Sequence, residues 1–367
     1  MSSEGEVPSP ACVAPLFFIL VSSRWLPSHW SRLYQSRCRC ARRRLANIRG
    51  RGGTSPHSIR LQRNRARWRF ELAARLLNIV GAATSAGAYA PGQEQAPATF
   101  RRHGLAKALA GRKREVRDHG DVASFRWRPD SSRPQAMNLE AVRHACTLVA
   151  SKVAAAIAEQ EDTLVLGGDC TVELGTVAGA NMAGARTGLV YIDFDADLNI
   201  PETSDGALDW MGVAHLLDIP GCEPSLAGLG PIRPMLAPRQ LLYFGVENIT
   251  PPEAAAIRDH AIKVISREEA LNDIGVAAAR TVKWAAQFDC VLIHFDADVL
   301  SFIDFPIAEN VRRCDGLKLE QAAFVLNRLT ALPQWRALTI TEVNPDHAPD
   351  ESAAFTRLND MLADALG

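Results

Sequence analysis

The fold is decided by an apolar run that ends in alternating aspartates, Thr187-Gly188-Leu189-Val190-Tyr191-Ile192-Asp193-Phe194-Asp195-Ala196-Asp197. A short apolar run followed by polar residues is typical of a strand that is buried on both faces of a parallel sheet. Residues two apart in an extended segment point the same way, so Asp193, Asp195 and Asp197 are expected to share one side. The run 290–295 repeats this pattern, because Asp296-Ala297-Asp298 follows it directly.

Similar runs alternate with helical patterns from residue 74 to residue 367. We predict strands at 76–81, 115–121, 163–168, 187–193, 240–245, 261–265, 290–296 and 337–342. We predict helices at 98–111, 138–160, 252–260, 267–287 and 317–330. This alternation indicates an α/β domain with a parallel sheet covered on both faces, in which a site lies at the carboxyl ends of the strands.

The first 75 residues differ in charge from the rest of the chain. They contain fifteen Arg, no Lys and three Glu, although the whole chain of 367 residues has a formal net charge of zero. We interpret residues 1–70 as a disordered Arg-rich extension or a start assigned too far upstream. A transit peptide and a polyanion-binding tail are the alternatives.

The composition excludes several classes of protein. Hydrophobic residues make up 47% and charged residues 22%, as in soluble globular proteins, which excludes a fully disordered, fibrous or multi-span membrane protein. Eight cysteines without a Cys-x-x-Cys pair suit a reducing compartment. We therefore expect a cytoplasmic protein without a membrane partner, and a nucleic-acid partner only in the alternative of a polyanion-binding tail.

Polar residues follow four of the predicted strands. They are Gly167-Gly168-Asp169-Cys170-Thr171, Asp193 to Asn199, Asp296-Ala297-Asp298 and Glu342-Val343-Asn344-Pro345. Five aspartates in one crevice would repel one another, so they must bind protons or a cation. Hard divalent ions such as Mn²⁺ prefer such oxygen ligands. The alternative is that these aspartates cap helices or form ordinary turns.

The order of these motifs resembles the ureohydrolase family, which contains arginase, agmatinase and formiminoglutamase. The family motif Gly-Gly-Asp-His-Ser is similar to Gly167-Gly168-Asp169-Cys170-Thr171, and Asp-Ala-His-x-Asp is similar to the segment from Asp193 to Asp197. Asp-x-Asp and Glu-x-Asn-Pro correspond to the segments that begin at Asp296 and Glu342. The resemblance covers residues from about 74 to the C-terminus.

The resemblance implies a three-layer α/β/α fold, a homo-oligomer and two Mn²⁺ ions that activate a water against the central carbon of a guanidino or amidino compound. Its implied metal ligands are Cys170, Asp193, Asp195, Asp197, Asp296 and Asp298. Asp197 would also transfer a proton, and Glu342 would face the cationic group of the substrate. Asn199 would contact the substrate. Independently of the resemblance, His347 follows the Glu-x-Asn-Pro turn and is a further candidate for substrate binding.

The sequence departs from the family pattern at three site positions. Cys170 and Asp195 replace histidine ligands, and a Cys thiolate favours Zn²⁺, Fe²⁺ or Co²⁺ over Mn²⁺. Asp209 stands where arginases have a catalytic His, and is a candidate proton carrier. Thr250 falls near the Asp that recognises the amine in arginase, so we do not expect L-arginine as substrate. His294, two residues before Asp296, is a candidate replacement ligand.

Two functions follow from these observations. The first is a divergent metal-dependent hydrolase that cleaves a C–N bond of a guanidino, amidino or formimino compound. The alternative is a catalytically inactive protein with the same fold and a binding or regulatory role, which the loss of both histidine ligands favours.

Overall fold

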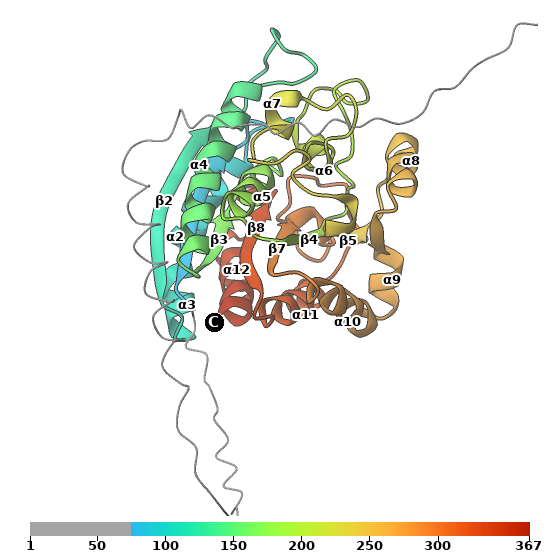
Figure 1. Cartoon of the computed structure of the whole chain (residues 1–367). Helices are drawn as coiled ribbons and strands as arrows, with labels where there is room; N and C mark the ends of the chain where they lie inside the picture. The colour runs from blue at the N-terminus through green and yellow to red at the C-terminus, as the bar shows by residue number, and fades with distance from the viewer. Residues whose placement is uncertain (1–74) are drawn as a thin grey trace, which may run out of the picture. The chain divides into compact units, whose positions relative to one another are not determined.

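Eight parallel strands form the centre of the structure in the order β2-β1-β3-β8-β7-β4-β5-β6 (Figure 1). The computed structural model describes residues 75–367, so the extension predicted at residues 1–70 lies outside the described residues. The strands are β1 (Leu77–Thr84), β2 (Val116–Phe125), β3 (Asp162–Leu166), β4 (Thr187–Ile192), β5 (Leu241–Val246), β6 (Lys263–Ser266), β7 (Cys290–Asp296) and β8 (Trp335–Thr341). All eight predicted strands are present.

Helices cover both faces of the sheet, as the apolar strands require. Neighbouring strand residues bury their side chains in opposite layers: Leu164 and Ile192 belong to one hydrophobic cluster, and Val165 and Tyr191 belong to the other. The first cluster includes side chains of α10 (Ile274–Ala285), α11 (Leu319–Thr330) and α12 (Glu351–Leu366). The second includes α4 (Leu139–Ala158), α5 (Val172–Met182) and α6 (Gly212–Leu217). The predicted three-layer α/β/α fold is confirmed.

Two glycines bring α5 unusually close to α4. A Cβ atom on Gly175 would lie 2.6 Å from the carbonyl oxygen of Cys146, and one on Gly179 would lie 2.6 Å from that of Ala150. Among the described residues, α4 is the helix that is long and apolar enough to cross a membrane by length and composition alone. Its apolar residues, such as Val149 and Val153, belong instead to the hydrophobic cluster with α5.

Two of the predicted helices are interrupted. The helix predicted at 98–111 is α2 (Ala96–Arg102) followed by α3 (Leu105–Gly111), because Gly104 between them adopts a left-handed φ of 86°. The helix predicted at 267–287 is α9 (Arg267–Asn272) followed by α10, because the Asp273 side chain caps a new helix by accepting the N–H of Val276. α4, α8 (Pro251–Asp259) and α11 follow the predictions, whereas α5, α6, α7 (Pro224–Ala227) and α12 lie outside the predicted helices.

The strand order explains how distant motifs reach one place. The four motif-bearing strands β3, β8, β7 and β4 are consecutive neighbours in the sheet, although β5 and β6 separate the pair β3 and β4 from the pair β7 and β8 in the sequence. Their carboxyl ends therefore lie side by side at one edge. Gly167 and Gly168 fit between two neighbouring backbones: the Gly167 N–H donates to the Ile340 carbonyl at 2.7 Å, and the Gly168 carbonyl accepts the N–H of Glu342 at 2.8 Å.

Gly168→Ala is expected to destabilise the fold by about 3 kcal/mol, at the upper end of overpacking effects. A Cβ atom there would lie 1.6 Å from the backbone carbonyl oxygen of Thr84, which no side-chain movement can relieve. Gly111→Ala is the control, because nothing lies within 4 Å of its Cβ position. Urea denaturation measures the free energy of unfolding, which should be lower for Gly168→Ala than for Gly111→Ala. Equal values for the two variants would contradict this packing argument.

Candidate active site

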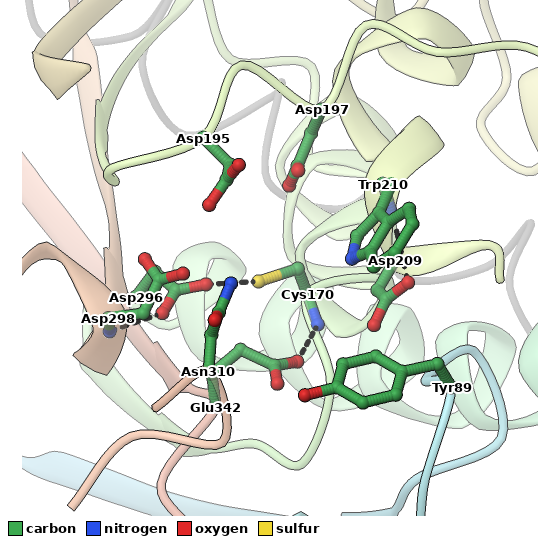
Figure 2. Close-up of a pocket in the computed structure, with 10 residues that line it drawn as sticks. All are labelled: Tyr89, Cys170, Asp195, Asp197, Asp209, Trp210, Asp296, Asp298, Asn310 and Glu342. Carbon is green, nitrogen blue, oxygen red and sulfur yellow. Dashed lines mark hydrogen bonds between the residues drawn. The ribbon is translucent and has the colours of Figure 1, made fainter. Parts of the chain in front are cut away.

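Seven of the residues predicted from sequence line one narrow pocket at the carboxyl edge of the sheet (Figure 2). Cys170 precedes α5, Asp197 follows β4, Asp296 ends β7 and Glu342 follows β8. The complete lining is Tyr89, Cys170, Asp195, Asp197, Asp209, Trp210, Asp296, Asp298, Asn310 and Glu342. The side chains leave a space of about 20 Å³, which is room for about one water molecule. The topology thus concentrates carboxylates around a very small volume.

Four potential ligands meet in the deepest part of this site. The Cys170 thiol donates to Asp296 Oδ2 at 2.9 Å, and His294 Nε2 lies 3.7 Å from Asp193 Oδ2. The ligand atoms of these four residues lie within 4.8 Å of one another, and all four residues are buried. Asp193 Oδ2 has no hydrogen-bond partner among residues 75–367. This mixed sulfur, nitrogen and oxygen set fits one divalent cation of the Zn²⁺, Fe²⁺ or Co²⁺ class.

Burial disfavours the charged form of the carboxylates in the site. Burial and the neighbouring Asp296 raise the pKa of Asp193 well above its ordinary value, and burial raises the pKa of Asp296 to about 6. Burial, with the charge of Asp296 next, also raises the pKa of Cys170. Burial lowers the pKa of His294 to about 3, so its imidazole is neutral and able to bind a metal. A cation would offset the repulsion and displace the protons.

His294 is oriented by two neighbours that the sequence did not reveal. Its Nδ1 atom lies 3.6 Å from Glu173 Oε2, on the side of the ring away from Asp193. The Tyr191 ring stacks on the imidazole at a centroid distance of 4.0 Å and an angle of 9°. Metal-binding histidines commonly donate a hydrogen bond from the second ring nitrogen to a carboxylate, which fixes the tautomer. Glu173 stands beside Nδ1 in this way, but at 3.6 Å it is not hydrogen-bonded to it.

Asp197 also lines the pocket, and its side chain is held in place. The Tyr191 hydroxyl donates to Asp197 Oδ2 at 2.5 Å, and the backbone of Asp197 has a left-handed φ of 50°. Its carbonyl accepts the N–H groups of Val213 and Ala214 at the start of α6. The carboxylate therefore points into the site from a left-handed backbone conformation that these hydrogen bonds stabilise.

The other two predicted catalytic residues also face the pocket. Asp209 Oδ1 accepts the N–H of Trp210 at 2.9 Å, and burial followed by the charges of Asp169 and Asp197 raises the pKa of Asp209 well above its ordinary value. Glu342 Oε1 accepts a hydrogen bond from the backbone N–H of Cys170 at 3.1 Å, and its Oε2 accepts one from Nε2 of Gln93 at 3.0 Å. Gln93 begins a short 3-10 helix (Gln93–Gln95) between β1 and α2, and no sequence pattern marked it.

The two remaining predicted substrate contacts lie farther out. Asn199 donates to Glu253 Oε1 at 3.0 Å and lines an outer cavity of about 390 Å³. His347 is absent from the lining of both cavities; its Nδ1 atom lies 2.7 Å from the Ala308 carbonyl. Substrate binding by His347 stays a prediction.

Asp195 lies in the site but faces an unexpected partner. Arg313, in the loop between β7 and α11, forms a bidentate ion pair with it through contacts of 2.7, 2.9 and 3.0 Å. The Asn248 side chain also donates to Asp195 Oδ1. Nothing in the sequence pattern singled out Arg313, which stands in an irregular loop far from Asp195 in the chain.

Known proteins are similar to this chain in sequence and in fold. The chain matches the Arginase family over residues 76–363. It is 27% identical to human Arginase-1 over 297 residues, which is 80% of this chain and 92% of that protein. It is 29% identical to Arginase-1 of Rattus norvegicus over 274 residues, 73% of this chain and 84% of that protein.

The crystal structure of arginase from Bacillus subtilis matches this fold with a TM-score of 0.71 and 24% identity, over 80% of this chain and 99% of that chain. The family match covers the described α/β domain and all four site motifs. The chain belongs to the arginase family, as a divergent member.

Proposed function

We propose that this protein is a metal-dependent hydrolase that cleaves a C–N bond of a guanidino, amidino or formimino compound. The observation that carries the proposal is the meeting of Cys170, Asp193, His294 and Asp296 around one buried point beside the pocket. Hydrolysis of linear amidines is the chemistry of the arginase family, to which the chain belongs.

Cys170, Asp193, His294 and Asp296 would hold the proposed ion, and Asp197 and Asp298 line the adjoining pocket. A divalent ion held there would lower the pKa of a water and so supply a nucleophile near neutral pH. Mn²⁺ is the ion that the family resemblance implies, whereas the thiol and the imidazole favour Zn²⁺, Fe²⁺ or Co²⁺. We propose an ion of this second group.

The protein side chains supply binding and proton transfer. Glu342 presents an anchored carboxyl group for the cationic end of the substrate. Asp209 faces the same pocket, and burial raises its pKa, which favours the protonated form, so it is placed to protonate a leaving amine. The rings of Tyr89 and Trp210, whose centroids are 5.8 Å apart, line the same pocket.

The outer cavity supports a substrate other than L-arginine. Thr250, near the position expected to recognise the substrate amine, uses its hydroxyl to donate to Glu253 Oε2 at 2.7 Å and caps α8. A threonine that is engaged in this way supplies no charge for an ammonium group. A cytoplasmic location and a homo-oligomer are part of the proposal and rest on the sequence arguments alone.

Burial, with the charge of Asp296 next, raises the pKa of Glu342, and a cationic substrate group would favour its ionised form. The amide of Glu342→Gln cannot ionise, so this variant is expected to lower kcat/KM by at least about 100-fold without releasing the metal. The assay incubates metal-loaded protein with guanidino, amidino and formimino compounds and measures released ammonia, urea or amine. Glu351→Gln is the control, since Glu351 pairs with Arg102 and His103 on the surface. Metal-loaded wild-type protein that releases no product from any compound would contradict the proposed function.

A further inference from the structure

We propose that Arg313 takes the place of one of the two metal ions that the family resemblance implies, so that each chain binds a single divalent ion. This inference rests on the proposed function, because it concerns the same metal site. It starts from a second group of potential ligands, Asp193, Asp195 and Asp298, whose carboxylate oxygens also lie within 4.8 Å of one another. A second ion would have to bind there.

The guanidinium of Arg313 already lies against this group. Its Nη2 atom is 2.7 Å from Asp195 Oδ1 and 2.9 Å from Oδ2, and its Nε atom is 3.0 Å from Oδ2. The same Nε atom lies 3.9 Å from Asp298 Oδ2. The positive charge is therefore beside two of the three carboxylates that a second ion would need.

The hydrogen-bonding capacity of Asp195 is fully used. A carboxylate offers about four lone-pair positions, and Asp195 receives three contacts from Arg313 and one from the Asn248 amide. To bind an ion, Asp195 would have to give up a bidentate ion pair that is mostly buried, since the Arg313 side chain is only 17% exposed. Breaking such a pair is costly because it leaves a charge without a partner.

Arg313 is also fixed from its other sides. Its guanidinium carbon lies 5.1 Å from the centre of the Phe194 ring, and its backbone carbonyl accepts the N–H of Phe302 at 2.7 Å. A guanidinium stacked on an aromatic ring and paired with a carboxylate is a stable arrangement for Arg. Arg313 therefore acts as a resident cation, and its charge would repel a second ion near Asp298.

The change from histidine to Asp195 agrees with this role. A neutral imidazole at position 195 would give Arg313 no ion pair, whereas a carboxylate gives it a bidentate one. The deep cluster of Cys170, Asp193, His294 and Asp296 does not use Asp195 and is left intact for one ion. The substitution thus removes one metal position and preserves the other.

The test is a metal titration of the full chain after chelator treatment. Co²⁺ is added in steps, and bound ion is counted by its absorption bands and by elemental analysis after equilibrium dialysis. Wild-type protein is expected to bind one ion per chain. Arg313→Ala and Arg313→Gln are expected to bind two, because Asp195 and Asp298 are then free to serve as ligands.

Arg312→Ala is the matched control, because Arg312 is the adjacent arginine and lines the same outer cavity without contacting Asp195. It should bind one ion, as should Arg313→Lys, which keeps the charge. Two ions bound to the wild-type protein would overturn this inference but not the proposed function. The same holds if Arg313→Ala and Arg313→Gln both fold and each bind only one ion. No ion in the wild type would overturn the proposed function as well.

Discussion

Asp296→Asn is expected to lower both the metal affinity and the rate of hydrolysis by at least about 100-fold. This is more than is typical when a residue that only supports a metal ligand is lost. Asp296 belongs to the deep cluster and lies 2.9 Å from the Cys170 thiol. The substitution keeps the shape of the side chain, and its amide oxygen can still accept the N–H of Asp298. The loss is therefore one of ligand charge rather than of local structure.

The same variant should leave the metal-free protein at least as stable as the wild type. Burial raises the pKa of Asp296 to about 6 in the folded state, from 3.8. Ionisation of this carboxyl group therefore costs folding free energy, and the cost appears as the pH rises from about 4 through about 6. The amide cannot ionise, so the stability difference should favour the variant above about pH 6.

Urea denaturation of chelator-treated protein at two pH values measures this difference, and a product-release assay measures activity. Asp289→Asn is the control, since Asp289 is an exposed residue before β7 that pairs with Arg186. Breaking a buried ion pair costs about 3 kcal/mol or more of the free energy of unfolding. A loss of that size in the metal-free variant above pH 6 would show that Asp296 is a structural residue.

Cys170→Ser is expected to weaken Zn²⁺ and Co²⁺ binding by at least about 100-fold and Mn²⁺ binding far less, because only the softer ions prefer a thiolate. Burial raises the pKa of the Cys170 thiol, so the thiol is protonated before the ion arrives. Metal binding must then release that proton. Wild-type affinity for Zn²⁺ should therefore increase with pH more steeply than that of the variant.

Chelator competition at several pH values measures these affinities, and the Co²⁺ complex reports thiolate binding through its charge-transfer absorption. Cys290→Ser is the matched control, because Cys290 is also buried but begins β7, at the opposite end of that strand from Asp296. If Cys170→Ser bound Zn²⁺ as tightly as the wild type with the same pH dependence, Cys170 would not be a ligand.

The sequence predicts the sheet well because each buried strand has its own apolar run and ends in a recognisable motif. The Asp193-Phe194-Asp195 and Asp296-Ala297-Asp298 segments marked both the strand ends and the site. Helix breaks were harder to predict, since Gly104 and Asp273 interrupt helices that are otherwise continuous in pattern. One capping side chain or one left-handed residue decides such a break.

The partners within the site could not be predicted in the same way. Asp195 was correctly expected near the other carboxylates, but its ion pair depends on the course of the loop that carries Arg313. His294 was recognised only as a candidate by its spacing from Asp296, whereas its position between Glu173 and Asp193 depends on how β7 and its neighbours pack. Such contacts join segments far apart in the sequence, and no local pattern encodes them.

The most direct test is elemental analysis of the purified chain after incubation with Mn²⁺, Zn²⁺, Fe²⁺ and Co²⁺ in separate samples and removal of free ion. We expect retention of about one ion per chain, preferentially Zn²⁺, Fe²⁺ or Co²⁺, and loss of that ion in Asp296→Asn. Retention of none of the four ions would contradict the metal centre. The protein would then fit the alternative of a catalytically inactive family member with a binding or regulatory role.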